Sequence, residues 1–351
     1  MMMEPKKNRI QRIFTQAFPA PPRWTDWFFD EVYSDDEAML LTKDGNAVST
    51  LMLMDYAYSF HGRSLPMGYI YGATTARDVR GKGFMSQLIA DAIGRAHEQG
   101  MAFVSLVPSE DRLFRFYARF GFATVFYNDC CRYTSAHIFA PDPVFGAVEP
   151  TYALFSRLEQ LRSSTVLHSD RQFGHIIRDI ALYRGLVHAV ADDTGERGAM
   201  AFAVHSADGS RVEVRELLAT DDGAAESVLA LVSASMPLNP ITVFAPAGSR
   251  IVRLEPRGMM RITDAAKVLD TVAAADPRTE QVIRVHDKLI PDNNGVYILH
   301  NGECQHTDST MRRLTLDVDV ATLTSVLFSS ESMGAVFGLP TQRGCLPLML
   351  D

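Results

Sequence analysis

The stretch Tyr69-Ile-Tyr-Gly-Ala-Thr-Thr-Ala-Arg-Asp-Val-Arg-Gly-Lys-Gly-Phe-Met85 decides the fold prediction. Its first half has the character of a strand, and its glycines lead into a helix over 84–99 with apolar positions on one face. Glycine lets the backbone approach a ligand closely, so the unpaired N–H groups and dipole at the helix start can hold a diphosphate, with Arg80 and Lys82 adding charge. A Gly-rich turn that merely starts a helix is the alternative for this segment taken alone.

The elements around this stretch form a recognisable order. Apolar spacing and turn residues predict two helices, a three-strand antiparallel meander, the helix after the glycines, a strand, a helix capped by Gly121 and a last strand. The predicted ranges are helices over 9–18 and 24–33, strands over 38–41, 47–58 and 65–75, a strand over 102–107, a helix from about 111 to 120, and a strand over 123–133.

The remainder divides into two further regions. After the prolines at 141, 143 and 150, the predicted order of elements partly repeats, with helices over 152–162 and 170–182, strands over 184–191, 198–206 and 210–219, and a helix over 224–234. From residue 255 the pattern changes, with helices over 263–274 and 320–328 and strands over 281–290, 295–300 and 313–318. We therefore predict domains at 1–140, 141–254 and 255–351.

Composition excludes several classes of protein. The chain has 351 residues, of which 47% are hydrophobic and 22% charged, as in globular proteins of two or three domains. With 34 Lys and Arg against 42 Asp and Glu, the net charge of −8 argues against a nucleic-acid partner. The four cysteines (130, 131, 304 and 345) fit neither a disulfide framework nor a zinc site, and no metal is expected. Without a signal segment or an apolar run of about 18 residues, we expect no membrane partner and a cytoplasmic protein.

A second motif follows the glycine loop. Residues 113–122, Leu-Phe-Arg-Phe-Tyr-Ala-Arg-Phe-Gly-Phe, place Tyr117 on a helix that ends in Gly-Phe. Together the two motifs resemble the GNAT superfamily of acyl-CoA-dependent N-acetyltransferases. The family motif Arg/Gln-x-x-Gly-x-Gly/Ala matches at Arg80 and Gly83 and departs at Met85, whose backbone N–H is still present.

Over the full length the chain resembles the Eis-like (enhanced intracellular survival) acetyltransferases. This resemblance rests on architecture more than on motifs. It implies an α/β (α+β) fold with tandem GNAT domains, the second degenerate, and a C-terminal sterol-carrier-like α+β domain. It also implies a homo-oligomer, with hexamers common among relatives.

The resemblance implies direct acetyl transfer from acetyl-CoA, used as cosubstrate, to an amine. Backbone amides of 79–85 would hold the pyrophosphate, and the strand edge at 72–74 would pair with the pantetheine and polarise the thioester carbonyl. The implied cofactor-binding residues are Gly72, Ala73, Thr74, Val79, Arg80, Gly81, Lys82, Gly83, Phe84 and Met85.

Two residues are implied as catalytic. Tyr117 matches the family tyrosine that faces the thioester sulfur as general acid, with packing on its own helix as the alternative. The chain ends Leu346-Pro-Leu-Met-Leu-Asp351, an apolar tail that we expect to be buried, and Asp351 offers a side-chain and a terminal carboxylate as base. Many relatives end in an aromatic residue, so this match is loose.

The acceptor pocket is less defined. Trp24, Trp27, Phe28 and Phe60 are predicted to form its apolar wall, beside an acidic run over 30–37 whose alternative is a solvated charged face. The predicted acceptor is a primary amine of a cationic small molecule, aminoglycoside-like or polyamine, or a lysine side chain. The alternatives are a non-enzymatic acyl-CoA sensor and a carrier of apolar ligands.

The second copy of the domain lacks the glycine loop. Asp221-Asp222-Gly223 stands where the first copy has Arg80-Gly81-Lys82-Gly83, and two carboxylates repel a diphosphate. We therefore expect one acetyl-CoA per chain.

Overall fold

The computed structural model describes residues 4–237, 239–246 and 255–350. Its contacts divide the chain into two compact units. The first unit contains 1–125 and 257–343, and the second contains 126–256 and 344–351. The domain boundaries at 140 and 254 stay predictions. Residues 257–343 of the C-terminal region belong to the first unit, whereas the tail from residue 344 belongs to the second.

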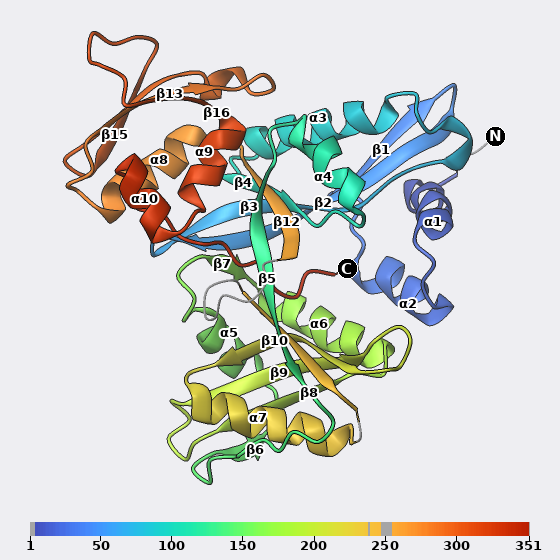
Figure 1. Ribbon diagram of the computed structural model, residues 1–351. Helices are drawn as coiled ribbons and strands as arrows, with labels where there is room; N and C mark the ends of the chain where they lie inside the picture. Colours follow the sequence, from blue (N-terminus) through green and yellow to red (C-terminus); the bar gives the residue numbers. More distant parts are fainter. Residues whose placement is uncertain (1–3, 238, 247–254, 351) are drawn as a thin grey trace. The chain divides into compact units, whose positions relative to one another are not determined.

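The sheet of the first unit is the predicted meander, extended by two strands (Figure 1). Its strands are β1 (Ala38–Lys43), β2 (Asn46–Phe60), β3 (Arg63–Thr75), β4 (Phe103–Leu106) and β12 (Glu255–Ile262). β1, β2 and β3 pair antiparallel, β4 is parallel to β3, and β12 is antiparallel to β4. β12 was not predicted, because its five buried positions, 258–262, include a glycine and an arginine that break the apolar pattern.

The helices of this sheet agree with the predicted order. They are α1 (Lys6–Ala17), α2 (Pro22–Trp27), the π-helical turn η1 (Phe28–Val32), the short 3-10 turn η2 (Arg77–Val79), α3 (Phe84–Glu98) and α4 (Asp111–Ala118). The single helix expected over 24–33 is thus α2 continued by a π turn, which begins after Trp27. α3 buries Leu88, Ile89, Ala92, Ile93 and Ala96, the face that its periodicity predicts.

The C-terminal part of the first unit carries a second, four-stranded sheet of order β15-β14-β13-β16. Its elements are α8 (Ala265–Ala275), β13 (Gln281–His286), η3 (Pro291–Asn293), β14 (Gly295–His300), β15 (Glu303–Thr307), β16 (Leu316–Asp319), α9 (Val320–Leu327) and α10 (Glu331–Phe337). β15 and α10 were missed: β15 is a polar edge strand with no fully buried position, and α10 is short and contains a glycine.

The second unit repeats the order of strands and helices found in the first unit. Its elements are β5 (Ala123–Tyr133), whose first three residues belong to the first unit, β6 (Gly146–Val148), α5 (Tyr152–Glu159), β7 (Thr165–Leu167), α6 (Asp170–Leu182), β8 (Leu186–Ala191), β9 (Gly198–His205), β10 (Val212–Ala219), α7 (Asp222–Ser235) and β11 (Ile241–Pro246). β8, β9 and β10 form an antiparallel meander, and β11 returns after α7 to lie parallel to β10. β1, β2, β3, α3 and β4 have the same order, which confirms a degenerate GNAT copy.

Two further observations bear on the class of protein. No helix in the described ranges is long and apolar enough to cross a membrane. All four cysteines are free, and the part of the chain that the structure describes holds no group of three His, Cys, Asp or Glu side chains able to bind a metal ion.

Candidate active site

A β-bulge interrupts β3 at Gly72. Thr50 of β2 pairs with Thr74, whereas Met52 pairs with Tyr71, so β3 has one residue more than β2 at this point. Gly72 has φ +62°, and a Cβ there would lie 2.7 Å from Cε2 of Phe14. Only glycine therefore fits the bulge, which bends the strand and leaves a backbone group unpaired.

The opposite edge of β3 is open at the same level. β4 pairs with β3 through 67–69 only, as far as the described residues go, so β3 continues past β4 over residues 70–75. An extended ligand can add to such an edge through backbone hydrogen bonds. The predicted pantetheine-binding residues Gly72, Ala73 and Thr74 lie on this stretch.

The glycine loop leaves the start of α3 accessible. Gly81 and Gly83 have φ of +78° and +85°, and a Cβ at either would meet no atom within 4 Å. The N-cap of α3 is Gly83, and no side chain caps the helix. The first N–H groups of α3 are therefore available to an anion, as a diphosphate site requires. Arg80 closes the loop by donating from Nε to the Thr75 carbonyl at 3.2 Å.

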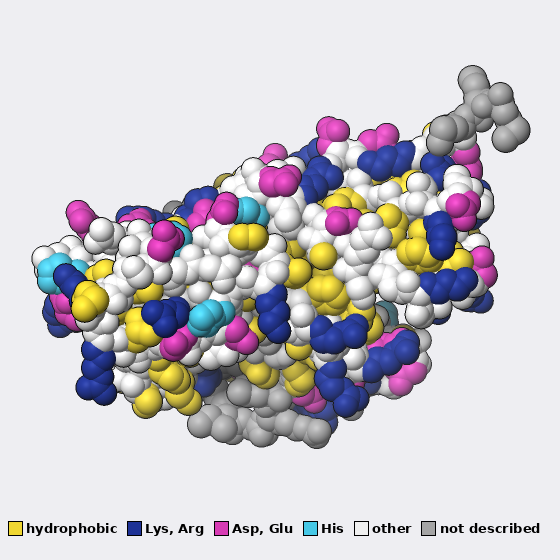
Figure 2. Space-filling model, turned by 90° about the horizontal axis from the view of Figure 1, so that it is seen from above, with side chains coloured by type: hydrophobic (Ala, Val, Ile, Leu, Met, Phe, Trp, Pro, Cys, Tyr) yellow, Lys and Arg dark blue, Asp and Glu magenta, His cyan; other side chains and the backbone are white. Residues whose placement is uncertain are grey.

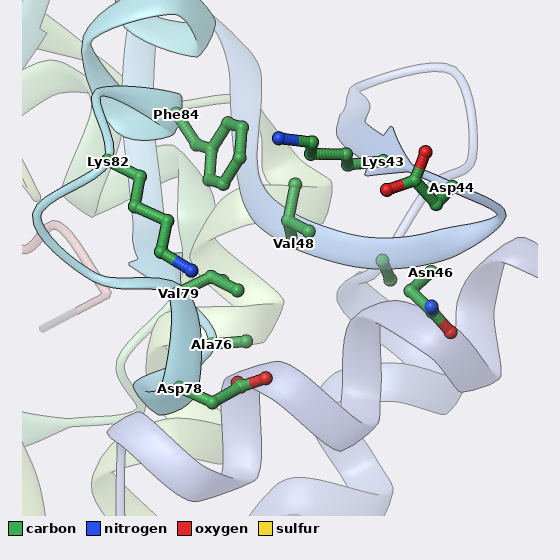
Figure 3. A pocket seen from close by; sticks show the side chains of 10 residues that line it. Lys43, Asp44, Asn46, Val48, Ala76, Asp78, Val79, Lys82 and Phe84 are labelled. Carbon is green, nitrogen blue, oxygen red and sulfur yellow. The ribbon is translucent and has the colours of Figure 1, made fainter.

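A pocket of about 300 Å³ lies beside this loop (Figure 3). One wall is Val79, Lys82 and Phe84, three of the predicted cofactor residues, and the other comes from the turn between β1 and β2. The Lys43 ammonium points toward the ring of Phe84, 5.5 Å from its centroid. Lys43, Asp44, Asn46 and Val48 carried no signal in the sequence, because only the fold brings that turn next to the loop.

Tyr117 lies on α4 and is 7% exposed. It belongs to the same hydrophobic cluster as Leu88 and Ile89 of α3, and its ring packs against Phe116 and Phe122. Burial disfavours the charged phenolate and raises the pKa of Tyr117 to about 12. Within the described ranges no group hydrogen-bonds its hydroxyl, so the O–H remains available to a ligand.

The predicted acceptor wall is split between two aromatic groups. Trp24 and Phe28 are buried and stack with Phe14, and Phe28 also contacts Tyr71, next to the bulge. Trp27 is half-buried at the edge of this group. Phe60, by contrast, is fully buried and packs against Phe103 and Phe328.

The acidic run beside α2 is engaged in surface contacts. Asp30 pairs with Lys7 at 2.8 Å, and Asp35 accepts a 2.6 Å hydrogen bond from the Tyr33 hydroxyl. Burial and this contact raise the pKa of Tyr33. Asp30 thus links η1 to α1, and Asp35 fixes the Tyr33 side chain close to its own backbone.

The apolar tail is buried, as expected. Gly344 and Cys345 form parallel bridges with Phe126 and Thr165 in the second unit. Leu346, Met349 and Leu350 are each at most 6% exposed, and Leu348 packs against that unit's core. Asp351, the predicted base, lies outside the described residues.

The start of α7 differs from that of α3. Asp221 is its N-cap and accepts from the Ala224 N–H at 3.1 Å. A hydrogen bond from Arg197 is the main cause that lowers the pKa of Asp221 to about 2. A carboxylate therefore occupies the place where α3 presents open amides.

This geometry agrees with what the chain is similar to. Residues 3–125 match the model of the acetyltransferase (GNAT) domain, and residues 265–336 match the sterol carrier protein domain. The first unit thus contains a GNAT acetyltransferase domain, whose chemistry is acyl transfer.

Solved structures extend the likeness to the whole chain. A probable N-acyltransferase from Enterococcus faecalis has a TM-score of 0.78 at 14% identity, covering 99% of this chain and 97% of that one. A GCN5-related N-acetyltransferase from Anabaena variabilis has a TM-score of 0.77 at 15% identity, covering 98% of each chain. Eis1 from Mycobacterium abscessus has a TM-score of 0.71 at 15% identity, covering 97% of this chain and 92% of that one. Over its whole length the chain therefore has the fold of these acetyltransferases, Eis1 among them. No curated protein sequence matches the chain.

Proposed function

We propose that this protein transfers the acetyl group of acetyl-CoA to a primary amine of a cationic small molecule, aminoglycoside-like or polyamine, or to a lysine side chain. The observation that carries the proposal is the uncapped, glycine-bounded start of α3 beside the bulged, open edge of β3. The two features together fit the diphosphate and the amide-containing arm of an acyl-CoA.

Backbone groups would bind the acetyl-CoA and orient its thioester. The amides of residues 79–85, with Arg80 and Lys82, would hold the diphosphate, and the 72–74 edge would orient the thioester carbonyl. Acetyl-CoA supplies an activated acyl group, so no covalent enzyme intermediate is needed. A backbone N–H at the bulge would stabilise the charge that develops on the carbonyl oxygen.

Tyr117 is proposed as the hydrogen-bond donor to the departing sulfur. Its raised pKa keeps the hydroxyl protonated at neutral pH. An ordinary thiol has a pKa of about 8.5, so complete proton transfer from this phenol to a thiolate would be uphill. Tyr117 therefore acts by stabilising the developing negative charge, and solvent protonates the sulfur after the thiolate departs.

Asp351 is proposed as the acceptor of the amine proton, through its side chain or the terminal carboxylate. The burial of Leu346, Met349 and Leu350, just before the chain end, supports this. On the face in Figure 2 acidic and basic side chains are interspersed, so local contacts and not a long-range field would select the cation. On the Eis-like fold alone, we also propose a cytoplasmic homo-oligomer.

The test is thiol release from acetyl-CoA across a panel of aminoglycosides, polyamines and lysine peptides. We expect at least one amine to raise the rate well above hydrolysis, with mass spectrometry showing one acetyl group added to that amine. Binding of acetyl-CoA without acceleration by any amine would contradict the proposal and favour an acyl-CoA sensor.

A further inference from the structure

Arg261 of β12 contacts the end of the helix that carries Tyr117. Its side chain is 1% exposed, and its Nε donates to the Phe120 carbonyl at 2.7 Å. The N–H of Phe120 in turn donates to the Tyr117 carbonyl at 2.9 Å. Two hydrogen bonds and one residue, Phe120, therefore connect the guanidinium to the backbone of Tyr117.

The guanidinium is itself held in place. Nη2 donates to Asp287 Oδ1 at 2.6 Å, and Nη1 donates to the Ile262 carbonyl at 2.7 Å. Asp287 also accepts from the backbone N–H groups of Leu289 and Ile290 and from Asn293 Nδ2. Charge-assisted bonds to this many partners leave the guanidinium little freedom to move.

The turn after α4 packs closely on the same region. Gly121 has φ +82°, and a Cβ there would lie 2.9 Å from Cγ1 of Val320 and 3.2 Å from Arg261 Nε. Met259 and Ile290 belong to the hydrophobic cluster that contains Tyr117. α4 and the turn after it therefore pack against residues 259–320 as well as against the rest of the GNAT domain.

The C-terminal end of α3 also contacts residues that follow β12. His97 Nδ1 hydrogen-bonds the Thr263 carbonyl at 2.8 Å, and Thr263 Oγ1 donates to the Met101 carbonyl at 2.7 Å. The Lys267 ammonium donates to the Gly100 carbonyl. The helix whose start would hold the diphosphate and the helix that carries Tyr117 are thus both fixed at their C-terminal ends by residues 261–293.

We propose that Arg261, held by Asp287, is a positioning residue that keeps the Tyr117 hydroxyl in register with an acyl-CoA bound at the start of α3. The sterol-carrier-like region of this chain then serves acyl transfer by fixing the spacing between α3 and α4. The inference rests on the proposed function.

The test variant replaces both charges, Arg261→Met with Asp287→Asn. Removing one partner alone would leave a buried charge without compensation, whereas replacing both is often tolerated. The double variant loses the donor to the Phe120 carbonyl but keeps an acceptor at 287. Val228→Ala, in the core of the second unit, is the control for a general loss of stability.

Each change is made in the native chain and in Tyr117→Phe, with kcat for thiol release and the Kd for acetyl-CoA measured. We expect the pair change to lower kcat by about tenfold or more in the native chain, since small misplacements of reacting groups are costly. In Tyr117→Phe the same change should lower kcat less than twofold. The Kd should stay within about threefold throughout, and Val228→Ala should leave kcat unchanged. An unchanged kcat, or equal losses in both backgrounds, would overturn the proposal.

Amide hydrogen exchange of residues 111–121 separates this inference from the proposed function. The pair variant should exchange faster there than the native chain, while Val228→Ala should not. If no amine is acetylated by the native chain, the proposed function fails, and unchanged exchange in the pair variant would refute the anchoring of α4 separately.

Discussion

Tyr117 is buried, and its hydroxyl has no hydrogen-bond partner among the residues that the structure describes. Burial withdraws water from the hydroxyl and so disfavours the phenolate, which raises the pKa of Tyr117 to about 12. Such a group is unsuited to act as a base at neutral pH. It is suited to donate a hydrogen bond to an atom that gains negative charge.

Replacing Tyr117 by Phe should lower kcat by about 10²- to 10³-fold, the range typical of losing one hydrogen-bond donor to a developing negative charge. The Kd for acetyl-CoA should barely change, because the diphosphate and the pantetheine arm are held elsewhere. Pre-steady-state thiol release together with equilibrium binding checks both quantities. A turnover number equal to that of the native chain would sink the assignment.

The same pKa has a consequence for stability against pH. The pKa of Tyr117 is about 10 in the unfolded chain and about 12 in the folded one, so the folded state retains its proton longer. The free energy of unfolding should therefore fall as the pH rises from about 10 to about 12. Chemical denaturation at several pH values in that window should show that the free energy of unfolding falls less in Tyr117→Phe than in the native chain. An equal fall in the two proteins would contradict the raised pKa.

At the scale of elements, two helices with the same place in the topology begin differently. α3 begins at Gly83 with open amides, and α7 begins at Asp221, whose carboxylate already accepts from a helix N–H. Because a diphosphate needs those amides free and is repelled by a nearby carboxylate, the start of α3 suits such a ligand and the start of α7 does not.

Gly83→Asp should weaken acetyl-CoA binding by about 10- to 100-fold, whereas Gly83→Asn should weaken it much less. Asp and Asn tolerate a positive φ better than most residues do, and no atom lies within 4 Å of a Cβ at position 83. The two variants therefore differ mainly in charge. Unit charges about 4 Å apart at a protein surface interact by roughly 4 kcal/mol at most, which covers this range. Titration calorimetry measures the two Kd values, and equal losses would show that charge at the start of α3 is irrelevant.

At the scale of the molecule, the last residues are part of a core. Residues 344–350 belong to the second unit, and three of their apolar side chains are nearly inaccessible. The tail therefore contributes to the stability of the folded chain.

Deleting 347–351 should lower the free energy of unfolding by about 3 kcal/mol or more, given roughly 1.5–3 kcal/mol per buried apolar side chain, and should abolish turnover. Two gentler changes isolate the carboxylates: Asp351→Asn removes one, and a Gly-Ser extension displaces the other. We expect at least one of them to lower kcat about tenfold without altering stability in urea. Full activity in both would exclude the chain end as base.

Local patterns anticipated most elements of both units. The helical face of α3, the meander and the glycines of the loop are properties of neighbouring residues, so period and turn chemistry reveal them. β6 and β7 were missed because strands of three residues carry too little pattern, and β15 was missed because it is a polar edge strand. The π turn after Trp27 depends on aromatic packing against β3, which no local pattern encodes.

The sequence by itself determined the class of this protein, because a glycine loop, an amphipathic helix and the segment around Tyr117 follow from residue types at short spacings. Only the tertiary structure decided that β12 pairs with β4, that Arg261 supports α4, and that the turn at Lys43 faces the loop. These contacts join residues about 40 to 160 positions apart, and they depend on shared burial and on the need to satisfy buried polar groups.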